Sequence, residues 1–324
     1  MRRTVIMMML VSACAPKMQE AAVPISPPAL EASPVPAKAA AKTTAKKGVQ
    51  RLEGVFLPGD GARLPLRAWL PVSAPRAVIA AVHGFNDYSH AFTLPGGYFA
   101  ARGIATYAYD QRGFGAAPEP GVWPGEANLT GDLRRMVELL RARHPGAALY
   151  IMGESMGGAV AVAALTEPDF PKVDGAILLA PALWGGHRMN PLFRLPLWLL
   201  AHSFPAWRLS GQELQVQACD NKEVMAEINK DPLFIKATRT DAILGLVRLM
   251  DRAYADMPRL QTPALLLYGA HDEVIPGGPI ADARQAMPHA AFIRYPNGWH
   301  MLLRDQQRDT VAQDIVEWID GRIK

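Results

Sequence analysis

The chain has 324 residues, half of them apolar, which is enough for a sizeable core in one large domain or two small ones. Its formal net charge is +4, from 34 basic and 30 acidic residues. Seven basic residues but only two acidic ones fall within residues 1–50, which leaves 27 basic and 28 acidic residues in 51–324. Because the excess positive charge is confined to the N-terminal stretch, the composition argues against a nucleic-acid partner.

The N-terminus has the pattern of a targeting signal. Arg2 and Arg3 precede an apolar run over Val5–Val11, which is too short to span a bilayer but fits the apolar region of a signal peptide. The run continues into Leu10-Val11-Ser12-Ala13-Cys14, which resembles the lipobox of bacterial lipoprotein signals. A plain secretory signal, or an apolar N-terminus that happens to contain a cysteine, is the alternative.

The lipoprotein resemblance implies that residues 1–13 are a signal peptide and that Cys14 becomes the lipidated first residue of the mature protein. We therefore expect a membrane-anchored lipoprotein of the bacterial cell envelope that faces the periplasm. Ala15 is not the aspartate associated with inner-membrane retention, which favours the outer membrane.

The next stretch is rich in proline, alanine and lysine and has no apolar periodicity. Six prolines lie between Pro16 and Pro36. This composition predicts a disordered tether over residues 14–50, between the lipid and the folded domain. With Cys14 lipidated, Cys219 has no disulfide partner, and we expect it to be a small buried hydrophobe rather than a nucleophile.

From Arg51 onward, stretches typical of strands and of helices alternate. The predicted strands are Glu53–Leu57, Leu64–Leu70, Ala77–Val82, Ile104–Tyr109, Ala148–Met152, Gly175–Leu179, Ala264–Tyr268 and Phe292–Tyr295. The predicted helices are Thr93–Arg102, Gly131–Arg143, Gly158–Leu165, Val224–Ile228, Ile243–Tyr254 and Asp309–Ile319. This alternation predicts an α/β domain over residues 51–324, with a mostly parallel sheet of about eight strands and helices on both faces.

Residues 182–258 interrupt the alternation with tryptophans, leucine-rich runs and helix-like stretches. Ligand sites in open α/β sheets lie at the carboxyl ends of the strands, and this segment begins at such an end. It therefore favours a helical cap inserted over the active-site edge. The alternative is a loop-rich extension that packs elsewhere.

The sequence Gly153-Glu154-Ser155-Met156-Gly157 has the form G-x-S-x-G between a predicted strand and a predicted helix. This context is typical of a nucleophile elbow, in which a sharp turn lifts a serine above the sheet and glycines avoid clashes. It makes Ser155 the candidate nucleophile.

A serine hydroxyl needs a base, and the base needs an orienting carboxylate. Asp272 follows one predicted strand, with Glu273 as the neighbouring alternative, and His300 follows the last predicted strand. The order Ser, Asp, His, each at a strand exit, is that expected of the fold. We expect His271 to shape the turn beside the acid.

Acyl transfer also needs backbone donors for the oxyanion. We predict the N–H groups of Met156 and Phe85, the latter from the loop that begins at His83. His83 is expected to hold this loop by hydrogen bonds. Asp110 and Arg112 are interpreted as a pair that fixes the next loop. This chemistry needs neither a metal nor a cofactor.

Five motifs and a cap segment together resemble the monoacylglycerol lipase and lysophospholipase branch of the α/β-hydrolases, a group also described as serine aminopeptidase S33-like. The motifs are His83-Gly84-Phe85-Asn86-Asp87-Tyr88, Tyr109-Asp110-Gln111-Arg112-Gly113-Phe114-Gly115, Gly153-Glu154-Ser155-Met156-Gly157-Gly158, Gly269-Ala270-His271-Asp272 and Trp299-His300, and the cap segment is Asp231-Pro232-Leu233. The resemblance implies the triad Ser155, Asp272 and His300 and the oxyanion donors Phe85 and Met156. Glu154 departs from the family, since many animal members have histidine there.

The implied function is hydrolysis of lipid carboxylic esters such as monoacylglycerols or lysophospholipids through an acyl-enzyme. A peptidase or a small-ester esterase on the same triad is the alternative among enzymes. A catalytically silent lipid-binding lipoprotein and an envelope scaffold are the alternatives from other classes. The oligomeric state is left open.

Overall fold

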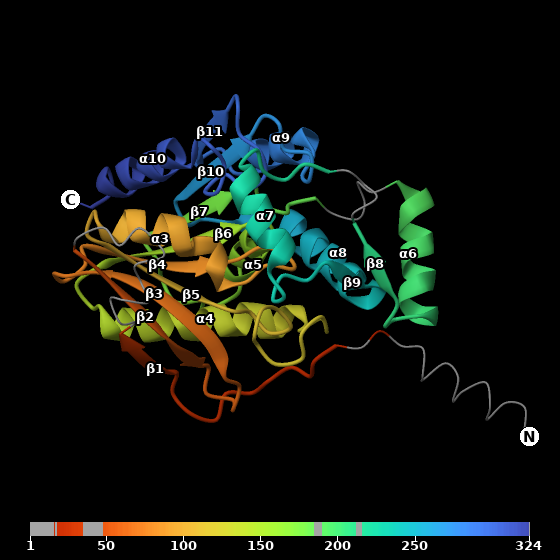
Figure 1. The fold of residues 1–324 in the computed structure, drawn as a ribbon, viewed down its shortest axis with the longest axis horizontal. Coiled ribbons are helices and arrows are strands. Elements are labelled where there is room, and N and C mark those ends of the chain that lie inside the picture. The colour runs from red at the N-terminus through yellow and green to blue at the C-terminus, as the bar shows by residue number, and fades with distance from the viewer. Residues whose placement is uncertain (1–15, 17, 35–47, 185–189, 212–215, 324) are drawn as a thin grey trace, which may run out of the picture.

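The computed structural model describes residues 16, 18–34, 48–184, 190–211 and 216–323. At its centre is a nine-stranded sheet in the order β1-β2-β3-β5-β4-β6-β7-β10-β11 (Figure 1). The strands are β1 (Ala29–Pro34), β2 (Val49–Leu57), β3 (Leu64–Pro71), β4 (Ala77–Val82), β5 (Ile104–Tyr109), β6 (Ala148–Glu154), β7 (Gly175–Leu179), β10 (Ala264–Gly269) and β11 (Ala291–Tyr295). The strands from β5 to β11 in this order pair in parallel, and β1, β2 and β3 extend the sheet antiparallel. The predicted α/β fold with a mostly parallel sheet is confirmed.

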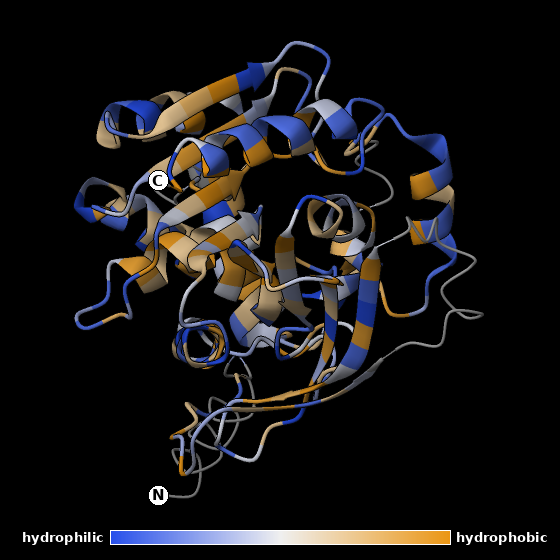
Figure 2. Ribbon diagram, turned by 90° about the vertical axis from the view of Figure 1, so that its left-hand side faces the viewer, coloured by the Kyte–Doolittle hydropathy of each residue, from blue (hydrophilic) through white to orange (hydrophobic). Residues whose placement is uncertain are grey.

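Helices cover both faces of the sheet. On one face lie α3 (Thr93–Ala100) and α10 (Arg308–Asp320), and on the other lie α4 (Glu126–Arg143), α5 (Met156–Leu165) and α9 (Gly277–Ala286). Successive side chains of a strand point to opposite faces of the sheet. In β4, Ile79 therefore packs on the face covered by α3 and α10, and Val78 packs on the face covered by α4, α5 and α9. Apolar residues are concentrated in the strands and on the inward faces of the helices (Figure 2). This is why the central strands read as continuous apolar runs.

Strand β1 lies within the stretch predicted to be a disordered tether, and for these residues that prediction is wrong. It pairs antiparallel with β2, from Ala29 opposite Leu57 to Pro34 opposite Leu52. Earlier residues also dock on the domain, since the Ala22 N–H donates a 2.8 Å hydrogen bond to Asn128 Oδ1. A composition rich in proline and alanine still allows six residues to pair with an open sheet edge, because the pairing uses backbone groups.

The segment between β7 and β10 forms a separate cap, as predicted. It contains α6 (Pro191–Ser203), β8 (Arg208–Ser210), α7 (Lys222–Lys230), β9 (Ala237–Arg239) and α8 (Thr240–Asp256). The short antiparallel pair β8–β9 was not predicted. Helix α8 packs on α5, and α6 packs on α8 at the outer end of the cap (Figure 1). In the described part of the chain, every helix is too short or too polar to cross a bilayer.

Candidate active site

Ser155 lies in the sharp turn between β6 and α5, where the sequence placed it. Its backbone has φ 54° and ψ −115°, a conformation that costs a residue with a side chain about 1–3 kcal/mol. Only glycines fit around this turn. A Cβ at Gly157 would lie 2.0 Å from the Val82 carbonyl oxygen, and one at Gly153 would lie 2.3 Å from that of Gly157. The structure therefore contains the strained elbow that presents a serine above a sheet.

Asp272 and His300 are hydrogen-bonded to each other. His300 Nδ1 lies 2.9 Å from Asp272 Oδ2, and both side chains are buried. The other oxygen of Asp272 accepts hydrogen bonds from the N–H groups of Val274 and Ile275 at 2.8 and 2.9 Å. Because the carboxylate accepts the Nδ1 proton, the Nε2 atom of His300 is left to act as a base.

Sheet order places the three candidate triad residues on one edge. Ser155 follows β6, Asp272 follows β10 and His300 follows β11, while β6, β7, β10 and β11 are successive parallel neighbours. The carboxyl ends of parallel strands meet at the same edge of a sheet, which is where open α/β folds bind ligands.

The neighbours of the acid have other roles. The carboxylate of Glu273 accepts the backbone N–H of Gln217, in the cap, at 2.7 Å. His271 stacks on Trp299 with ring centroids 5.3 Å apart. Asp272, and not its neighbour Glu273, is thus the carboxylate paired with the histidine, and His271 shapes the turn as expected.

His83, the first residue after β4, fixes the start of the loop that follows this strand. His83 Nε2 accepts the N–H of Gln111 at 3.0 Å, so its Nδ1 donates to the Gly84 carbonyl at 2.8 Å. Burial lowers the pKa of this imidazole, which keeps it neutral. A Cβ at Gly84 would lie 3.4 Å from the Cβ of Ser155, so the loop lies directly against the elbow.

Two backbone donors are available beside Ser155. Met156 is the first residue of α5, and the first N–H groups of a helix have no carbonyl partner within it. Within the described residues, no backbone carbonyl accepts the N–H of Phe85. The Phe85 ring is fixed by packing on Phe114 and Trp123, at centroid distances of 5.6 and 6.3 Å. Both N–H groups suit an oxyanion hole.

Asp110 and Arg112 do not pair with each other, in contrast to the prediction. Asp110 accepts hydrogen bonds from the hydroxyl and the N–H of Ser89, and Arg112 forms ion pairs with Asp60 and Asp132. Each of them does fix the loop after β5. The two side chains nevertheless diverge, because the loop turns between them to reach different elements.

A second ionic group, which was not predicted, lies at this edge of the sheet. Arg304 forms buried ion pairs with Asp87 and with Glu154. A carboxylate at the end of a buried strand, directly before the candidate nucleophile, needs a partner, and Glu154 is therefore the signal that could have prompted a search. No local pattern marks Arg304 itself, because it follows an apolar run.

Cys219 is buried and packs on Val224 and Met301, as expected of a small hydrophobe. Its sulfur lies within 4.8 Å of carboxylate oxygens of Asp220 and Asp305. Burial raises the pKa of the thiol to about 12, so it is neutral at ordinary pH and a poor metal ligand. The predicted lipidation site Cys14 lies outside the described residues.

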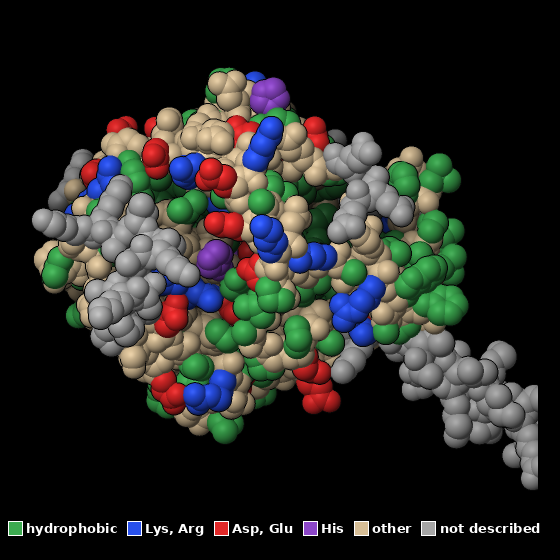
Figure 3. Space-filling view, in the orientation of Figure 1, with side chains coloured by type: hydrophobic (Ala, Val, Ile, Leu, Met, Phe, Trp, Pro, Cys, Tyr) green, Lys and Arg blue, Asp and Glu red, His purple; other side chains and the backbone are tan. Residues whose placement is uncertain are grey.

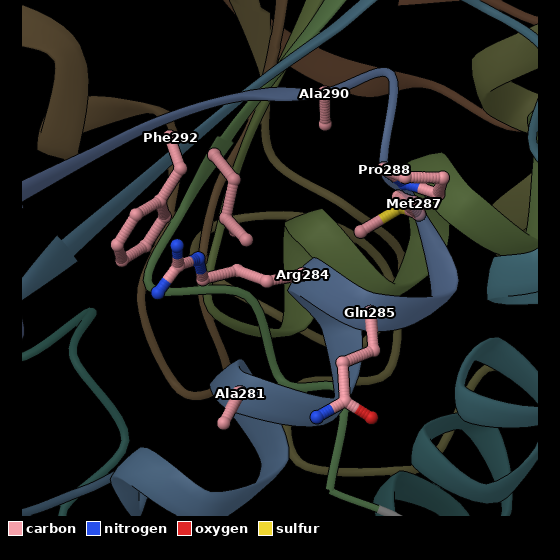
Figure 4. Close-up of a pocket in the computed structure, with 8 residues that line it drawn as sticks. Ala281, Arg284, Gln285, Met287, Pro288, Ala290 and Phe292 are labelled. Carbon is pink, nitrogen blue, oxygen red and sulfur yellow. The ribbon is translucent and has the colours of Figure 1, made fainter.

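Two cavities flank α9. One, of about 380 Å³, lies between α9 and β11, where Arg284 packs its guanidinium over the Phe292 ring (Figure 4). Its lining contains no nucleophile or base. The other, of about 420 Å³, includes Asp272 in its lining. A third cavity, of about 340 Å³, lies in the cap between α6 and α8.

The sequence pattern of the serine aminopeptidase S33 family matches residues 73–307. Because this match spans most of the chain, the protein belongs to that family of α/β-hydrolases.

Particular relatives lie among lipases. A monoacylglycerol lipase of Mycolicibacterium smegmatis is 25% identical, over 83% of this chain and 97% of its own length. The human monoglyceride lipase is 24% identical, over 81% of this chain and 88% of its own. The solved monoglyceride lipase of Saccharomyces cerevisiae, in complex with a substrate analogue, superposes with a TM-score of 0.69 at 21% identity, over 81% of this chain and 93% of that one.

Proposed function

We propose that the protein is a serine hydrolase that cleaves carboxylic esters of lipids, of the monoacylglycerol or lysophospholipid type. One observation carries the proposal: a buried Asp272–His300 hydrogen bond lies on the same sheet edge as the strained turn of Ser155. The names of the relatives add the substrate class.

The reaction then has two halves. His300 Nε2 takes the proton of Ser155 Oγ as that oxygen bonds to the ester carbonyl carbon. The N–H groups of Phe85 and Met156 hold the oxyanion, and Asp272 stabilises the imidazolium. The alcohol leaves with the proton of His300, and an acyl group remains on Ser155. Water, deprotonated by His300, releases the fatty acid.

The cap supplies the apolar surface that this substrate class requires. Its cavity between α6 and α8 is lined mainly by aliphatic and aromatic side chains, among them Leu195, Trp198 and Val247. Helix α6 also exposes large apolar side chains, with Leu192 77% and Phe193 70% exposed. Figure 3 shows hydrophobic side chains gathered over α6, at the right of the molecule. Such a surface suits contact with a lipid phase.

The first described residues near the predicted anchor lie on the same side of the molecule as the cap. Met18 pairs with Trp123, and the nearby Gly121 lies against the guanidinium of Arg208, in β8 of the cap. Cys14 precedes Met18 by four residues, which span at most about 14 Å. A lipid on Cys14 would thus enter the membrane beside the cap. On the lipobox-like sequence that ends at Cys14, we further propose a lipoprotein of the bacterial envelope that faces the periplasm, with the outer membrane favoured over the inner.

The family's description favours one rival activity, cleavage of an N-terminal amino acid from a peptide. A small-ester esterase uses the same groups. A silent lipid-binding lipoprotein would leave the Asp272–His300 pair and the strained serine without a role.

A hydrolysis panel tests the proposal. The full-length protein in detergent would be given a monoacylglycerol, a lysophospholipid, a short p-nitrophenyl ester and an N-terminal peptide amide, beside the Ser155→Ala variant. We expect turnover of the two lipid esters, lost with Ser155. Turnover of the peptide alone would favour the peptidase, and lipid binding without any turnover would favour the silent protein.

A further inference from the structure

Three segments at the carboxyl edge of the sheet meet at one buried guanidinium, that of Arg304. Its Nη1 lies 2.7 Å from Asp87 Oδ2, and its Nη2 donates a 3.0 Å hydrogen bond to Glu154 Oε2. The three side chains are only 6 to 8% exposed. Burial alone would lower the pKa of Arg304, but the two carboxylates outweigh it and raise the pKa, so the guanidinium keeps its charge.

The three members of this cluster come from three different segments of the proposed site, two of them loops and the third the end of β6, where Glu154 is the last residue. Asp87 lies two residues after the oxyanion donor Phe85, and Glu154 directly precedes the nucleophile. Arg304 follows the base by four residues. The cluster therefore connects, through one side chain, the segments that carry the oxyanion donor, the nucleophile and the base.

The cap holds the same loops from above. Asn221, at the start of α7, donates its side-chain amide to the Arg304 carbonyl at 3.1 Å. The Asn86 side chain donates to Thr238 Oγ1 at 2.7 Å. These contacts attach the loops of Asn86 and Arg304 to the cap.

Stability alone does not account for such a cluster, because the desolvation of buried charges cancels most of their attraction. The chain also contains an arginine cluster with more than one carboxylate away from the site. Arg252 Nη2 lies 2.8 Å from Glu167 Oε1, and its Nη1 lies 3.7 Å from Glu126 Oε2. That arginine joins α8 to a residue just after the C-terminal end of α5, the end opposite Ser155, so it provides a control.

We propose that Arg304 is a positioning residue, which sets the distance between the Phe85 N–H and Ser155 by holding Asp87 and Glu154 in its fork. A guanidinium can contact two carboxylates in fixed directions, whereas an ammonium is a single point charge that cannot. Misplacement of reacting groups by about 1 Å costs about 10²-fold in rate. The inference rests on the proposed triad.

The test compares arginine-to-lysine variants of the two clusters in the full-length protein. Arg304→Lys should lower kcat on the preferred ester by about 10²-fold, with KM changed only a few-fold. The inhibition constant of an alkyl trifluoromethyl ketone should rise by a similar factor, because its serine adduct carries the oxyanion. Arg252→Lys should lower the melting temperature while kcat and ketone affinity stay at the wild-type values.

A neutral triple variant, Asp87→Asn with Glu154→Gln and Arg304→Met, covers the case in which Arg304→Lys does not fold. It removes the buried charges together and should show the same loss of kcat and of ketone affinity. Wild-type kcat and ketone affinity in the Arg304 variants that fold would overturn the inference and leave the triad intact. Unchanged turnover in Ser155→Ala would overturn the triad itself, and this inference with it.

Discussion

Two regions of the molecule, the carboxyl edge of the sheet and helix α6 of the cap, hold side chains in environments that are unfavourable for them. The environments are of opposite kinds in the two regions. At the sheet edge, charged groups are buried, and the side chains of Asp272 and Arg304 are 0% and 8% exposed. On α6, large apolar groups are exposed, with Leu195 at 61% and Trp198 at 47%. Charge is buried where exact placement matters, and apolar surface is exposed where the partner is itself apolar.

The largest effect should come from the buried carboxylate. Asp272→Asn keeps the shape of the site but cannot hold His300 in the required tautomer, so kcat/KM on the preferred ester should fall about 10⁴-fold. Glu273→Gln is the matched control, because that carboxylate contacts Gln217 instead, and it should retain nearly full activity. Steady-state kinetics on both variants decide the point. Equal losses would contradict the assignment of the acid.

The second-largest effect should come from loss of the predicted lipid anchor at Cys14. If Cys14 carries lipid, Cys14→Ser should lower the ratio of membrane-bound to soluble protein about 10²-fold or more, because each buried methylene contributes about 0.8 kcal/mol. Fractionation after a high-salt wash, with immunoblotting, measures that ratio. A Cys14→Ser protein that stays in the membrane fraction would remove the anchor from the account.

The exposed face of α6 should matter only for substrate held in a lipid phase. Leu195→Ser combined with Trp198→Ser should slow hydrolysis of monoacylglycerol in vesicles about tenfold. Hydrolysis of a soluble short ester should change little. Val72→Ser, at a position 81% exposed but remote from the cap, is the control. Equal losses on both substrates would show that the cap residues act on folding rather than on lipid contact.

The smallest effect concerns stability and pH. Burial raises the pKa of Asp305 from 3.8 to about 6. Between these pH values the folded protein keeps a proton that the unfolded chain releases, so the free energy of unfolding falls as the pH rises through this window. Relative to Asp305→Asn, which cannot titrate there, the wild type should lose about 3 kcal/mol of unfolding free energy between about pH 3.5 and 7. Urea unfolding at both pH values measures it, and a constant difference would contradict the raised pKa.

The sequence was most informative where a local constraint is severe. The turn at Ser155 needs glycines at fixed spacing, and the buried strands need continuous apolar runs. Both requirements leave a pattern that can be recognised in the sequence alone. Helix α4 begins at Glu126 rather than at the predicted Gly131, because its first turn is specified by buried polar contacts of Asn128 rather than by apolar periodicity.

What the sequence did not reveal depends on distant partners. Strand β1 exists because β2 offers an open edge, and nothing in its own residues requires a strand. Arg304 and Glu154 are 150 positions apart, so their ion pair has no local pattern. Asp110 and Arg112 are close to each other in sequence, but Asp110 binds Ser89, 21 positions away, and Arg112 binds Asp132, 20 positions away, so their partners have no local pattern either. The catalytic roles of Ser155, Asp272 and His300 stay predictions until they are measured.

The central claim, that Ser155 is the nucleophile of a triad, is tested most directly by covalent labelling. The full-length protein would be treated with an alkyl p-nitrophenyl phosphonate, digested and mapped by mass spectrometry. We expect one phosphonyl group per chain, on Ser155, and strongly slowed labelling in His300→Ala. A label on another residue, or full ester hydrolysis with Ser155 unlabelled, would contradict it.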